Sequence, residues 1–556
     1  MFTLFLKTIE QNNYSNMRFL TAVLALALIS CKLTDDRSLA ERSITYKGIE
    51  NDIFILSADS LEGRAPFTIG EERTLKYLVG RMQEIGLEPA FNGDYLQPVP
   101  LVGITSKPSN EITFMTPKGN LKMRSGDDYT VWNPTLIQSL NIYNSELIFV
   151  GYGINAPEWD WNDFIGVDFH DKTIVVLVND PGFHTGNDSL FNGRSMSYYG
   201  RWRYKLEEAE RQGARGCIII HEDEAAGYPW TVVNRNVYQP DFYLDNEDIT
   251  HKKCIVNGWL TKESAIKLFA SCNMNYEEMK RLASERGFKA ITMEANYSIT
   301  IENNWEKSIS YNVGGLIKGS QRSDEVIIYT AHWDHLGIGS PVDGDSIYNG
   351  ASDNAAAVAW MLSIAQAFKS LKNPPERSVL FLSPTAEEAG MLGSQHYVDN
   401  PKFEHKKTVS CFNSDVIMFL GTFNDVTVTG LGHSELDNML EVEAAKQGRY
   451  ICNDPNSENG MFYRSDQLPF LKAGIPSLFA KGYSDQVNMG KQETQRVVDE
   501  YWKNTYHKPS DEYIPEEHNL QGLVDDTKLF FRLGYNLANS SYYPKWNLES
   551  EFYSER

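Results

Sequence analysis

The sequence predicts an α/β protein in which helices cover both faces of a central sheet, together with a smaller unit rich in β-strands. After residue 296, long buried strands alternate with helices, which is typical of a doubly covered sheet. Between residues 125 and 295 the apolar runs are shorter and more β-rich. The chain has 556 residues, whereas one hydrophobic core usually stops growing near ~250 to 300 residues, so we expect two folded units.

The order of elements follows from the spacing of apolar residues. The segment 48–90 has helical periodicity, with Leu75, Leu78 and Met82 at three- and four-residue steps. In the β-rich unit we expect strands at 146–154, 173–182 and 215–223 and a charged helix at 203–213. In the larger unit we expect strands at 325–332, 378–383 and 408–415 and helices at 354–370 and 390–398.

Composition and charge exclude several classes of protein. Hydrophobic residues make up 42% of the chain and aromatic residues 12%, which is enough apolar surface for packed cores. The net charge of -22 repels phosphate backbones, so nucleic acid is not an expected partner.

The first 31 residues predict an export signal. Met17-Arg18 opens a basic stretch, and residues 19–29 form an apolar core too short to span a membrane comfortably. Residues 28–31, Leu-Ile-Ser-Cys, resemble the lipobox of bacterial lipoproteins, in which the Cys becomes the lipidated first residue, and Met17 is then the expected start. The alternative is an ordinary signal peptide that contains a Cys. We therefore expect export to the bacterial cell envelope, lipid-anchored at Cys31 or periplasmic, with no other contact to the membrane.

The cysteines beyond Cys31 do not predict a metal site, because no C-x-x-C spacing occurs among them. An oxidising compartment permits one or two disulfides, and an odd number leaves at least one thiol unpaired. We expect most of them to pack as small buried hydrophobic residues. They are Cys217, Cys254, Cys272, Cys411 and Cys452.

Polar residues follow the predicted buried strands, where open α/β sheets place their ligand sites. His332 and Asp334 in the segment His332-Trp333-Asp334-His335 suit a metal ligand whose other ring nitrogen is held by a carboxylate. The adjacent Glu387 and Glu388 repel each other, and a nearby cation is the usual way to keep both ionised. Asp415 directly follows a third strand.

Two more residues complete the candidate set. Asp353 lies in 349-NGASDNAAAVAWML-362 at the mouth of an Ala-rich helix, and His507 lies in the loop 505-TYHKPSDEY-513. Each residue has a plain structural alternative: a polar strand-end loop, a helix N-cap at Asp353, or helix-start charge at the two glutamates. Together they supply two His, two Asp and two Glu, all but His507 expected at strand ends of one sheet. This combination indicates a bridged pair of divalent ions.

These motifs resemble the co-catalytic di-zinc exopeptidases, which include bacterial leucyl aminopeptidase and glutamate carboxypeptidase II. The likeness covers most of the chain, including 60-SLEGRAPFTIGEERT-74. It implies the zinc-exopeptidase α/β/α sandwich, with a mixed, mostly parallel sheet, and two Zn²⁺ per chain. The roles that it implies are these: His332 and Asp415 bind one zinc, Glu388 and His507 bind the other, Asp353 bridges the two, Glu387 is the general base, and Asp334 orients His332. It also implies a cis peptide bond after Asp353.

The resemblance extends to an inserted unit. The segments 149-FVGYGINAPEWDWNDFIGVD-168 and 199-YGRWRYKLEEAERQGARGCIIIHE-222 look like a protease-associated domain, which in relatives can cover the mouth of the active site. A solubilising or assembly module is the alternative. The implied division is residues 32–124 for the N-terminal part of the catalytic domain, 125–295 for the insert and 296–556 for the main part of the catalytic domain.

Two positions near the motifs qualify the resemblance. Gln467 stands in Ser465-Asp466-Gln467 where many relatives carry Ser-Asp-His, and Gln cannot titrate. Tyr506 precedes His507 as a Tyr does in glutamate carboxypeptidase II, where it stabilises the oxyanion; simple packing is the alternative.

The implied function is a zinc-dependent exopeptidase, foremost an aminopeptidase that removes N-terminal residues of peptides. The expected chemistry uses a hydroxide that bridges the two metals, with Glu387 as the base. Alternatives are a carboxypeptidase of the same fold, a catalytically inactive receptor-like protein and a glutaminyl cyclase. A serine hydrolase is disfavoured because no G-x-S-x-G motif occurs.

Overall fold

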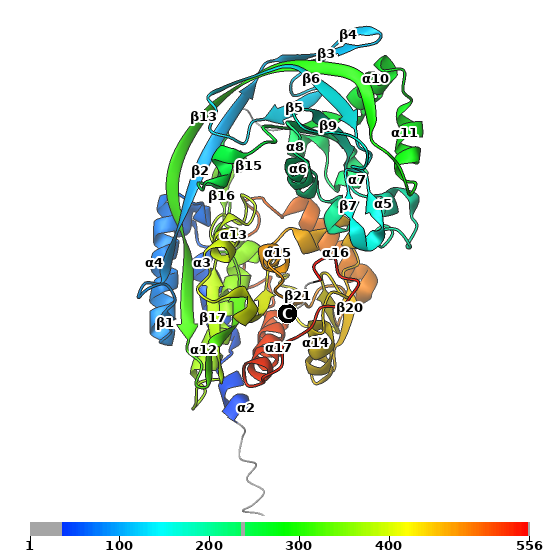
Figure 1. Cartoon of the computed structure of the whole chain (residues 1–556). Coiled ribbons are helices and arrows are strands. Elements are labelled where there is room, and N and C mark those ends of the chain that lie inside the picture. The colour runs from blue at the N-terminus through cyan, green and yellow to red at the C-terminus, as the bar shows by residue number, and fades with distance from the viewer. Residues whose placement is uncertain (1–35, 235–238, 554–556) are drawn as a thin grey trace, which may run out of the picture.

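The computed structural model describes residues 36–234 and 239–553, which form two units, one above the other in Figure 1. The smaller unit, coloured cyan to green, comes from the middle of the chain, and the larger unit contains the N-terminal helices and the C-terminal half. The predicted export signal lies outside the described residues. Within the described ranges, no helix is long and apolar enough to cross a membrane.

The sheet of the larger unit is mixed and mostly parallel, as predicted. β14 (Arg322–Thr330) lies between β17 (Arg377–Ser383) and β18 (Thr408–Asn413), parallel to both, and β18 is parallel to β21 (Ser477–Lys481). Antiparallel strands occur on both sides, where β13 (Ile291–Ile317) joins β17 and where β19 joins β21. The outer strands are β1 (Glu88–Pro89), β19 (Asp425–Val428) and β20 (Tyr450–Asn453).

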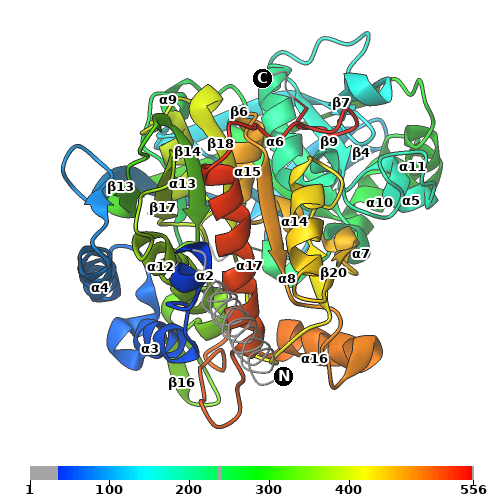
Figure 2. The same ribbon diagram turned by 90° about the horizontal axis from the view of Figure 1, so that it is seen from below.

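Helices cover both faces of this sheet because successive side chains of the buried strands point in opposite directions. On β14, Ile327 and Tyr329 pack against one helical layer, whereas Val326 and Ile328 pack against the other. Figure 2 shows α17 lying beside α12 and α2 in the first layer. The helices of that layer are α2 (Asp36–Glu41), α3 (Tyr46–Leu56), α4 (Ile69–Ile85), α12 (Ala356–Lys369), α14 (Leu436–Ala445) and α17 (Gln521–Ala538). The second layer contains α13 (Leu392–Asp399) and α15 (Gln467–Lys472).

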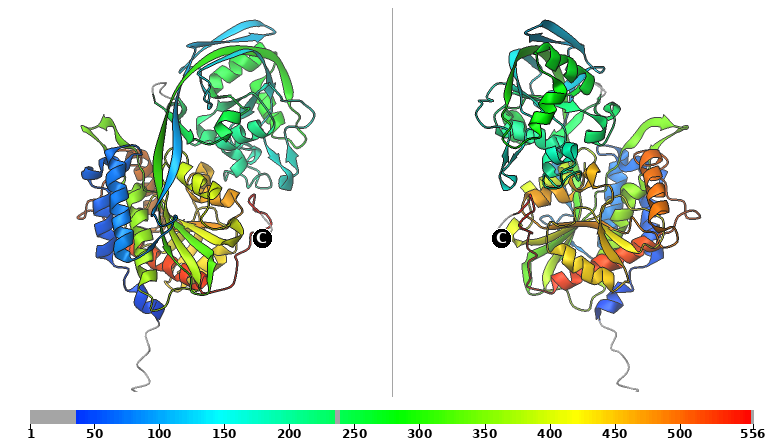
Figure 3. Two further views of the ribbon diagram at one scale, coloured as in Figure 1. Left: turned by 60° about the vertical axis from the view of Figure 1, so that its left-hand side comes forward. Right: turned by 90° about the vertical axis from the view of Figure 1, so that its right-hand side faces the viewer.

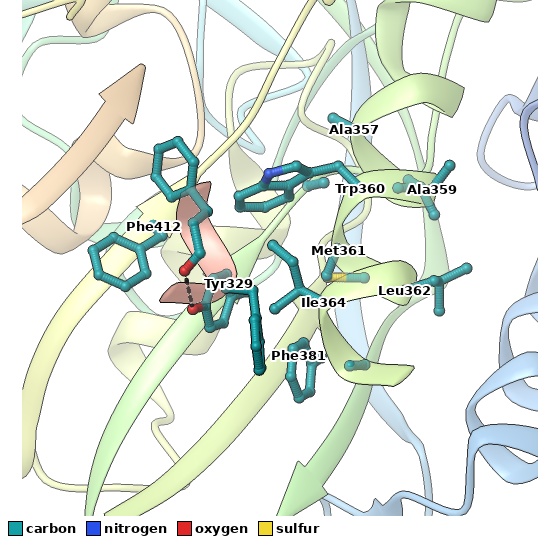
Figure 4. Close-up of a cluster of buried hydrophobic side chains, with 14 of the residues drawn as sticks. Tyr329, Ala357, Ala359, Trp360, Met361, Leu362, Ile364, Phe381 and Phe412 are labelled. Carbon is teal, nitrogen blue, oxygen red and sulfur yellow. Dashed lines mark hydrogen bonds between the residues drawn. The ribbon is translucent and has the colours of Figure 1, made fainter. Parts of the chain in front are cut away.

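Aromatic side chains fill the core between the sheet and the first helical layer. Figure 4 shows Tyr329 of β14 among Trp360 of α12, Phe381 of β17 and Phe412 of β18. The buried Tyr329 hydroxyl donates a hydrogen bond to the Phe530 carbonyl of α17 at 2.9 Å, so its polar atom does not go unpaired. This packing fixes the three parallel strands whose ends carry the candidate site.

The smaller unit has its own core and its own parallel strands. β6 (Ser139–Phe149), β9 (Thr173–Leu177), β10 (Gly216–His221) and β12 (Val256–Thr261) pair in that order, all parallel. Its other strands are β3 (Glu111–Thr116), β4 (Gly119–Arg124), β5 (Tyr129–Trp132), β7 (Asn155–Ala156), β8 (Trp161–Asn162) and β11 (Asp241–Leu244). Its helices are α5 (Pro181–Thr185), α6 (Trp202–Arg211), α7 (Asp223–Ala226), α8 (Trp230–Val233), α9 (Asp248–His251), α10 (Lys262–Ser271) and α11 (Tyr276–Ala283).

Two long strands connect the units. β2 (Leu96–Pro108) pairs with β13 over its whole length, and β13 pairs with β17 at one end and with β6 at the other. Figure 3 shows this curved ribbon rising from the larger unit into the smaller one. The domain limits at 125 and 295 stay a prediction, and Ile112 and Phe114, which precede residue 125, pack in the core of the smaller unit.

The remaining elements are short or peripheral. α16 (Gly490–Asn504) precedes the His507 loop, and β15 (Gly337–Val342) with β16 (Asp345–Tyr348) forms a separate hairpin. Short helical turns are η1 (Asp59–Arg64), η2 (Pro157–Trp159), η3 (Tyr198–Gly200), η4 (Ala351–Ala355), η5 (His405–Lys407), η6 (Ser457–Asn459) and η7 (Met461–Tyr463). In the described part of the chain all five cysteines are unpaired, and four of them are buried.

Candidate metal centre

Three of the predicted segments meet at one edge of the sheet. His332 follows β14, Glu387 and Glu388 follow β17, and Asp415 follows β18. Because these strands are adjacent and parallel, their carboxyl ends lie at the same edge. The two glutamates lie in a loop ahead of α13, which begins at Leu392, so the helix-start alternative does not account for them.

Asp353 reaches the same place from a different kind of segment. It lies in the turn η4, between β16 and α12, and not at a strand end of the main sheet as the sequence suggested. The N-cap of α12 is Ala355, which makes no side-chain cap, so the capping alternative for Asp353 also fails. The peptide bond between Asp353 and Asn354 is cis. Gly350 has a φ of 59°, and a Cβ there would lie 2.1 Å from the Asp353 carbonyl oxygen, which explains the glycine.

The side chains form two groups that share Asp353. In the first group, His332 Nε2 lies 3.3 Å from Asp415 Oδ1 and 3.5 Å from Asp353 Oδ1. In the second group, His507 Nε2 lies 3.2 Å from Asp353 Oδ2 and 3.2 Å from Glu388 Oε2. The Asp353 carboxylate therefore presents Oδ1 to His332 and Oδ2 to His507, which is the geometry of a bridging ligand.

His335 belongs to the second group and was not assigned a role from the sequence. Its Nδ1 lies 2.8 Å from Glu388 Oε1 and 4.0 Å from Asp353 Oδ1, and the side chain is fully buried. The only signal in the sequence was its place in the segment His332-Trp333-Asp334-His335, next to the predicted ligand. In a loop, the sequence does not set the direction of a side chain three residues after another, so the contact of His335 with Glu388 is seen only in the folded structure.

Asp334 and Glu387 lie beside the first group. His332 Nδ1 lies 3.0 Å from the Asp334 carbonyl oxygen and 3.8 Å from its carboxylate. The Asp334 carboxylate accepts hydrogen bonds from the backbone N–H groups of Glu387 at 3.1 Å and Glu388 at 3.4 Å. Asp334 thus holds His332 through its main chain and the two glutamates through its side chain. Glu387 Oε2 lies 3.9 Å from His332 Nε2.

The pKa values of the site residues are shifted because many buried carboxylates surround few basic side chains. Burial lowers the pKa of His507, but the carboxylates of Glu388 and Asp353 outweigh this effect and raise the value to about 10. His332 has a pKa well above its usual value, because Asp415 and Glu387 outweigh its burial. Burial raises the pKa of Glu387 well above its usual range, and Asp415 adds to this effect although His332 opposes it. A site that holds this many carboxylates together favours cations.

Tyr506 and Gln467 occupy defined places near the ligands. The Tyr506 ring stacks on His507 with centroids 3.8 Å apart, and its own burial, with the charges of Asp353 and Glu388, raises the pKa of its hydroxyl well above the usual value. Gln467 accepts a hydrogen bond from Asn413 at 2.6 Å and donates one to the Phe462 carbonyl at 2.5 Å. Asn413 is the last residue of the strand that leads to Asp415, so Gln467 supports the metal site indirectly.

The donor atoms fit a pair of divalent cations. His335, Asp353, Glu388 and His507 each offer a ligand atom within 4.8 Å of the others, and so do His332, Asp353 and Asp415. The Nε2 atom of His507 makes no hydrogen bond although it is buried, as expected of an atom that binds an ion. Imidazole nitrogen and carboxylate oxygen, without thiolate, are ligands that suit zinc.

A cleft of about 1100 Å³ opens beside the second group and lies between the two units. Its larger-unit wall includes His335, Glu388 and Phe67. Its smaller-unit wall includes Trp202 and Phe242, and the rings of Phe67 and Phe242 meet across the cleft at 5.3 Å. The cleft is large enough for several residues of an extended peptide.

Parts of the chain are similar to known peptidases. Residues 312–526 match the sequence model of peptidase family M28. Aminopeptidase YwaD of Bacillus subtilis (strain 168) is 31% identical over 220 residues, which are 38% of this chain and 42% of that protein. Carboxypeptidase Q of Xenopus laevis is 25% identical over 343 residues, 60% of each chain. This chain thus spans about half the length of these curated relatives. Among solved structures, an aminopeptidase from Aneurinibacillus sp. strain AM-1 aligns over 90% of this chain and 95% of its own, at 17% identity and a TM-score of 0.49.

Proposed function

We propose that the chain is a peptidase of family M28, whose sequence model residues 312–526 match, and that it is a zinc-dependent exopeptidase, foremost an aminopeptidase that hydrolyses N-terminal residues of peptides. The observation that carries the proposal is the shared carboxylate of Asp353, which faces His332 with one oxygen and His507 with the other. A single bridging carboxylate between two ligand groups is the arrangement needed to hold two ions close together.

Two zinc ions per chain are proposed. His332, Asp353 and Asp415 would hold one, and Asp353, Glu388 and His507, with His335 beside them, would hold the other. When bound, such a pair lowers the pKa of water toward neutrality and polarises the scissile carbonyl group.

Glu387 is the proposed general base. Its carboxylate lies beside His332 without being part of either ligand group, so its oxygens stay available to a water molecule. Glu387 accepts the proton of the attacking water and returns it to the departing amine nitrogen. Its main chain is held by Asp334, which limits the movement of the carboxylate between the two transfers.

Tyr506 is the proposed donor to the oxyanion of the tetrahedral intermediate. A phenol is protonated at neutral pH, the raised pKa of Tyr506 acts in the same direction, and only the protonated form can donate a hydrogen bond. Its ring is fixed by stacking on His507 and by Trp502, whose centroid lies 4.5 Å away.

The N-terminal specificity is supported by the relative YwaD, which is named an aminopeptidase. Carboxypeptidase Q, which matches a longer stretch of this chain, favours removal of C-terminal residues as the second candidate. Both activities use the same site and differ in which end of the peptide enters it.

A panel of short peptides tests the proposal. Each peptide is prepared free, blocked at the amino end and blocked at the carboxyl end, and each is assayed with and without a metal chelator. We expect cleavage of the free and carboxyl-blocked peptides and no cleavage in chelator. Cleavage of the free and amino-blocked peptides, with none of the carboxyl-blocked peptides, would assign a carboxypeptidase, and zinc binding without any cleavage would assign an inactive binding protein.

We infer the cellular location of the protein from residues 17–31. Their basic start, apolar core and terminal Cys31 support export and lipid attachment at Cys31. We expect the protein in the membrane fraction of a bacterial host and release of the Cys31→Ser variant into a soluble fraction. Wild-type protein that stays in the cytoplasm would contradict export.

A further inference from the structure

We propose that Arg64 and Asp511 are positioning residues that clamp the turn carrying Asp353 from its two sides and thereby set the bridging geometry. The inference rests on the proposed function, because it concerns how the chain holds its metal ligands. Neither residue belongs to a ligand group, and each is only 1% exposed.

Arg64 binds the carbonyl side of the turn. Its guanidinium donates to the carbonyl oxygens of Asn349 at 2.6 Å, Gly350 at 2.9 Å and Asp353 at 3.5 Å. Its Nε donates to the Trp333 carbonyl at 2.9 Å, directly after His332. One side chain from the N-terminal region therefore connects the loop of His332 with the turn of Asp353.

Asp511 binds the N–H side of the same turn. Its carboxylate accepts hydrogen bonds from the backbone N–H groups of Ser352 and Asp353, both at 3.1 Å. Its carbonyl oxygen accepts a third from the N–H of Ala351 at 2.9 Å. Asp511 lies four residues after His507 in the same loop, so it connects this ligand with the turn of Asp353.

The chemistry of the two side chains matches the two sides of the turn. A guanidinium has donors only, in a planar fork that can reach several carbonyls at once, whereas a carboxylate has acceptors only. Three consecutive N–H groups and three carbonyls of the segment 349–353 are thereby bound. A turn held on both sides has a fixed main chain, so the Asp353 side chain starts from a fixed Cα, and its two oxygens face His332 and His507.

A purely structural role is the alternative, because any buried arginine stabilises the fold around it. Arg377 provides the matched control: it is fully buried, forms an ion pair with Glu325 at 2.6 Å, and donates to the carbonyl oxygens of Leu537 and Tyr542. It lies at the opposite end of β17 from Glu387 and Glu388, so it has similar contacts away from the metal site.

The test compares Arg64→Lys and Asp511→Asn with Arg377→Lys and the wild-type full chain. Zinc affinity is measured by competition with a chromogenic chelator, and the free energy of unfolding is measured on the metal-free proteins. Lysine keeps the charge of Arg64 but cannot reach several carbonyls, and asparagine turns one acceptor of Asp511 into a donor. We expect both site variants to bind zinc about 10- to 100-fold more weakly, as is usual when partners of metal ligands are changed. Arg377→Lys should lose stability without a change in zinc affinity.

Each outcome is decisive. Wild-type zinc affinity in both site variants, with a loss of stability like that of Arg377→Lys, would reduce both residues to structural roles and overturn the inference. Failure of both site variants to fold would overturn it as well, because it would assign them to the fold as a whole. A wild-type chain that binds no zinc would overturn the proposed function itself. The measurement on the wild type alone separates this outcome from a failure of the inference about Arg64 and Asp511.

Discussion

His335 and Glu388 are in direct contact, with His335 Nδ1 2.8 Å from Glu388 Oε1, although 53 residues separate them in the chain. The segment His332-Trp333-Asp334-His335 therefore serves both ligand groups. His332 faces Asp415 in the first group, and His335 faces Glu388 in the second. The second group thus has two histidines, where the sequence predicted only His507.

Replacement of His335 by alanine should weaken the second ion selectively. We expect one of two zinc equivalents to be lost at a chelator concentration about 10- to 100-fold lower than for the wild type, because a ligand or a partner of a ligand is removed. Zinc retained per chain, measured by mass spectrometry after dialysis against graded chelator, gives the answer. His405→Ala, which removes a half-buried histidine whose ring bonds to the Val398 carbonyl, is the control. If His335→Ala and the control retain zinc equally, His335 does not contribute to the site.

The Glu387→Gln variant should keep both zinc ions and lose turnover. Glutamine has nearly the same shape but cannot accept the proton of the attacking water, so kcat should fall by about 10²- to 10⁴-fold. Glu443→Gln, which changes an equally buried glutamate paired with Lys446, should leave kcat unchanged. A kcat within a few-fold of the wild type in Glu387→Gln would remove Glu387 from its role.

Removal of the Phe242 ring should affect peptide binding more than chemistry. The ring lines the smaller-unit side of the cleft against Phe67 and lies in neither ligand group. An apolar contact made equally in the ground and transition states changes KM and leaves kcat alone. We expect Phe242→Ala to raise KM about 5- to 30-fold, the equivalent of losing about 1 to 2 kcal/mol of apolar contact. Phe54→Ala, at an exposed residue of α3, is the control, and an equal effect in both variants would contradict the role of the cleft.

Stability should fall in acid through His433. Its ring stacks on Phe462 with centroids 4.6 Å apart, and burial lowers its pKa to about 4. The pKa of His433 is lower in the folded state than in the unfolded state. Its contribution to the free energy of unfolding is therefore fully present above the unfolded pKa of about 6.5 and is lost as the pH falls through 4. We expect this residue to account for about 1 to 3 kcal/mol of the loss between these pH values. The free energy of unfolding, measured in urea at a series of pH values, should depend less on pH in His433→Asn than in the wild type. Parallel curves for the two proteins would show that His433 does not cause the loss of stability in acid.

The candidate ligands at strand ends could be placed near one another because the strands themselves are easy to recognise. A run such as 378–383 is buried on both faces, so a polar residue shortly after it must lie at the sheet edge where its neighbours also end. This reasoning placed His332, Glu388 and Asp415 together. Asp353 at a helix mouth and His507 in a distant loop carry no positional signal of their own. They were candidates by residue type, and their roles as the bridging ligand and as a ligand of the second ion came from the family resemblance.

The supporting residues could not be predicted because their contacts are with the main chain of distant segments. Arg64 donates to carbonyls more than 260 residues away, and any residue type supplies a carbonyl, so no pattern in the sequence marks the partners. The same holds for Asp511, which binds N–H groups of the Asp353 turn. His335 was visible in the motif, but its direction depends on the course of the loop after Asp334.

X-ray diffraction data collected at the zinc absorption edge test the central claim most directly. The account predicts two anomalous peaks, one in contact with His332 and Asp415 and the other with Glu388 and His507, with a different carboxylate oxygen of Asp353 directed at each. A zinc-loaded crystal with no peak at these side chains, or with a single ion that does not touch Asp353, would contradict it.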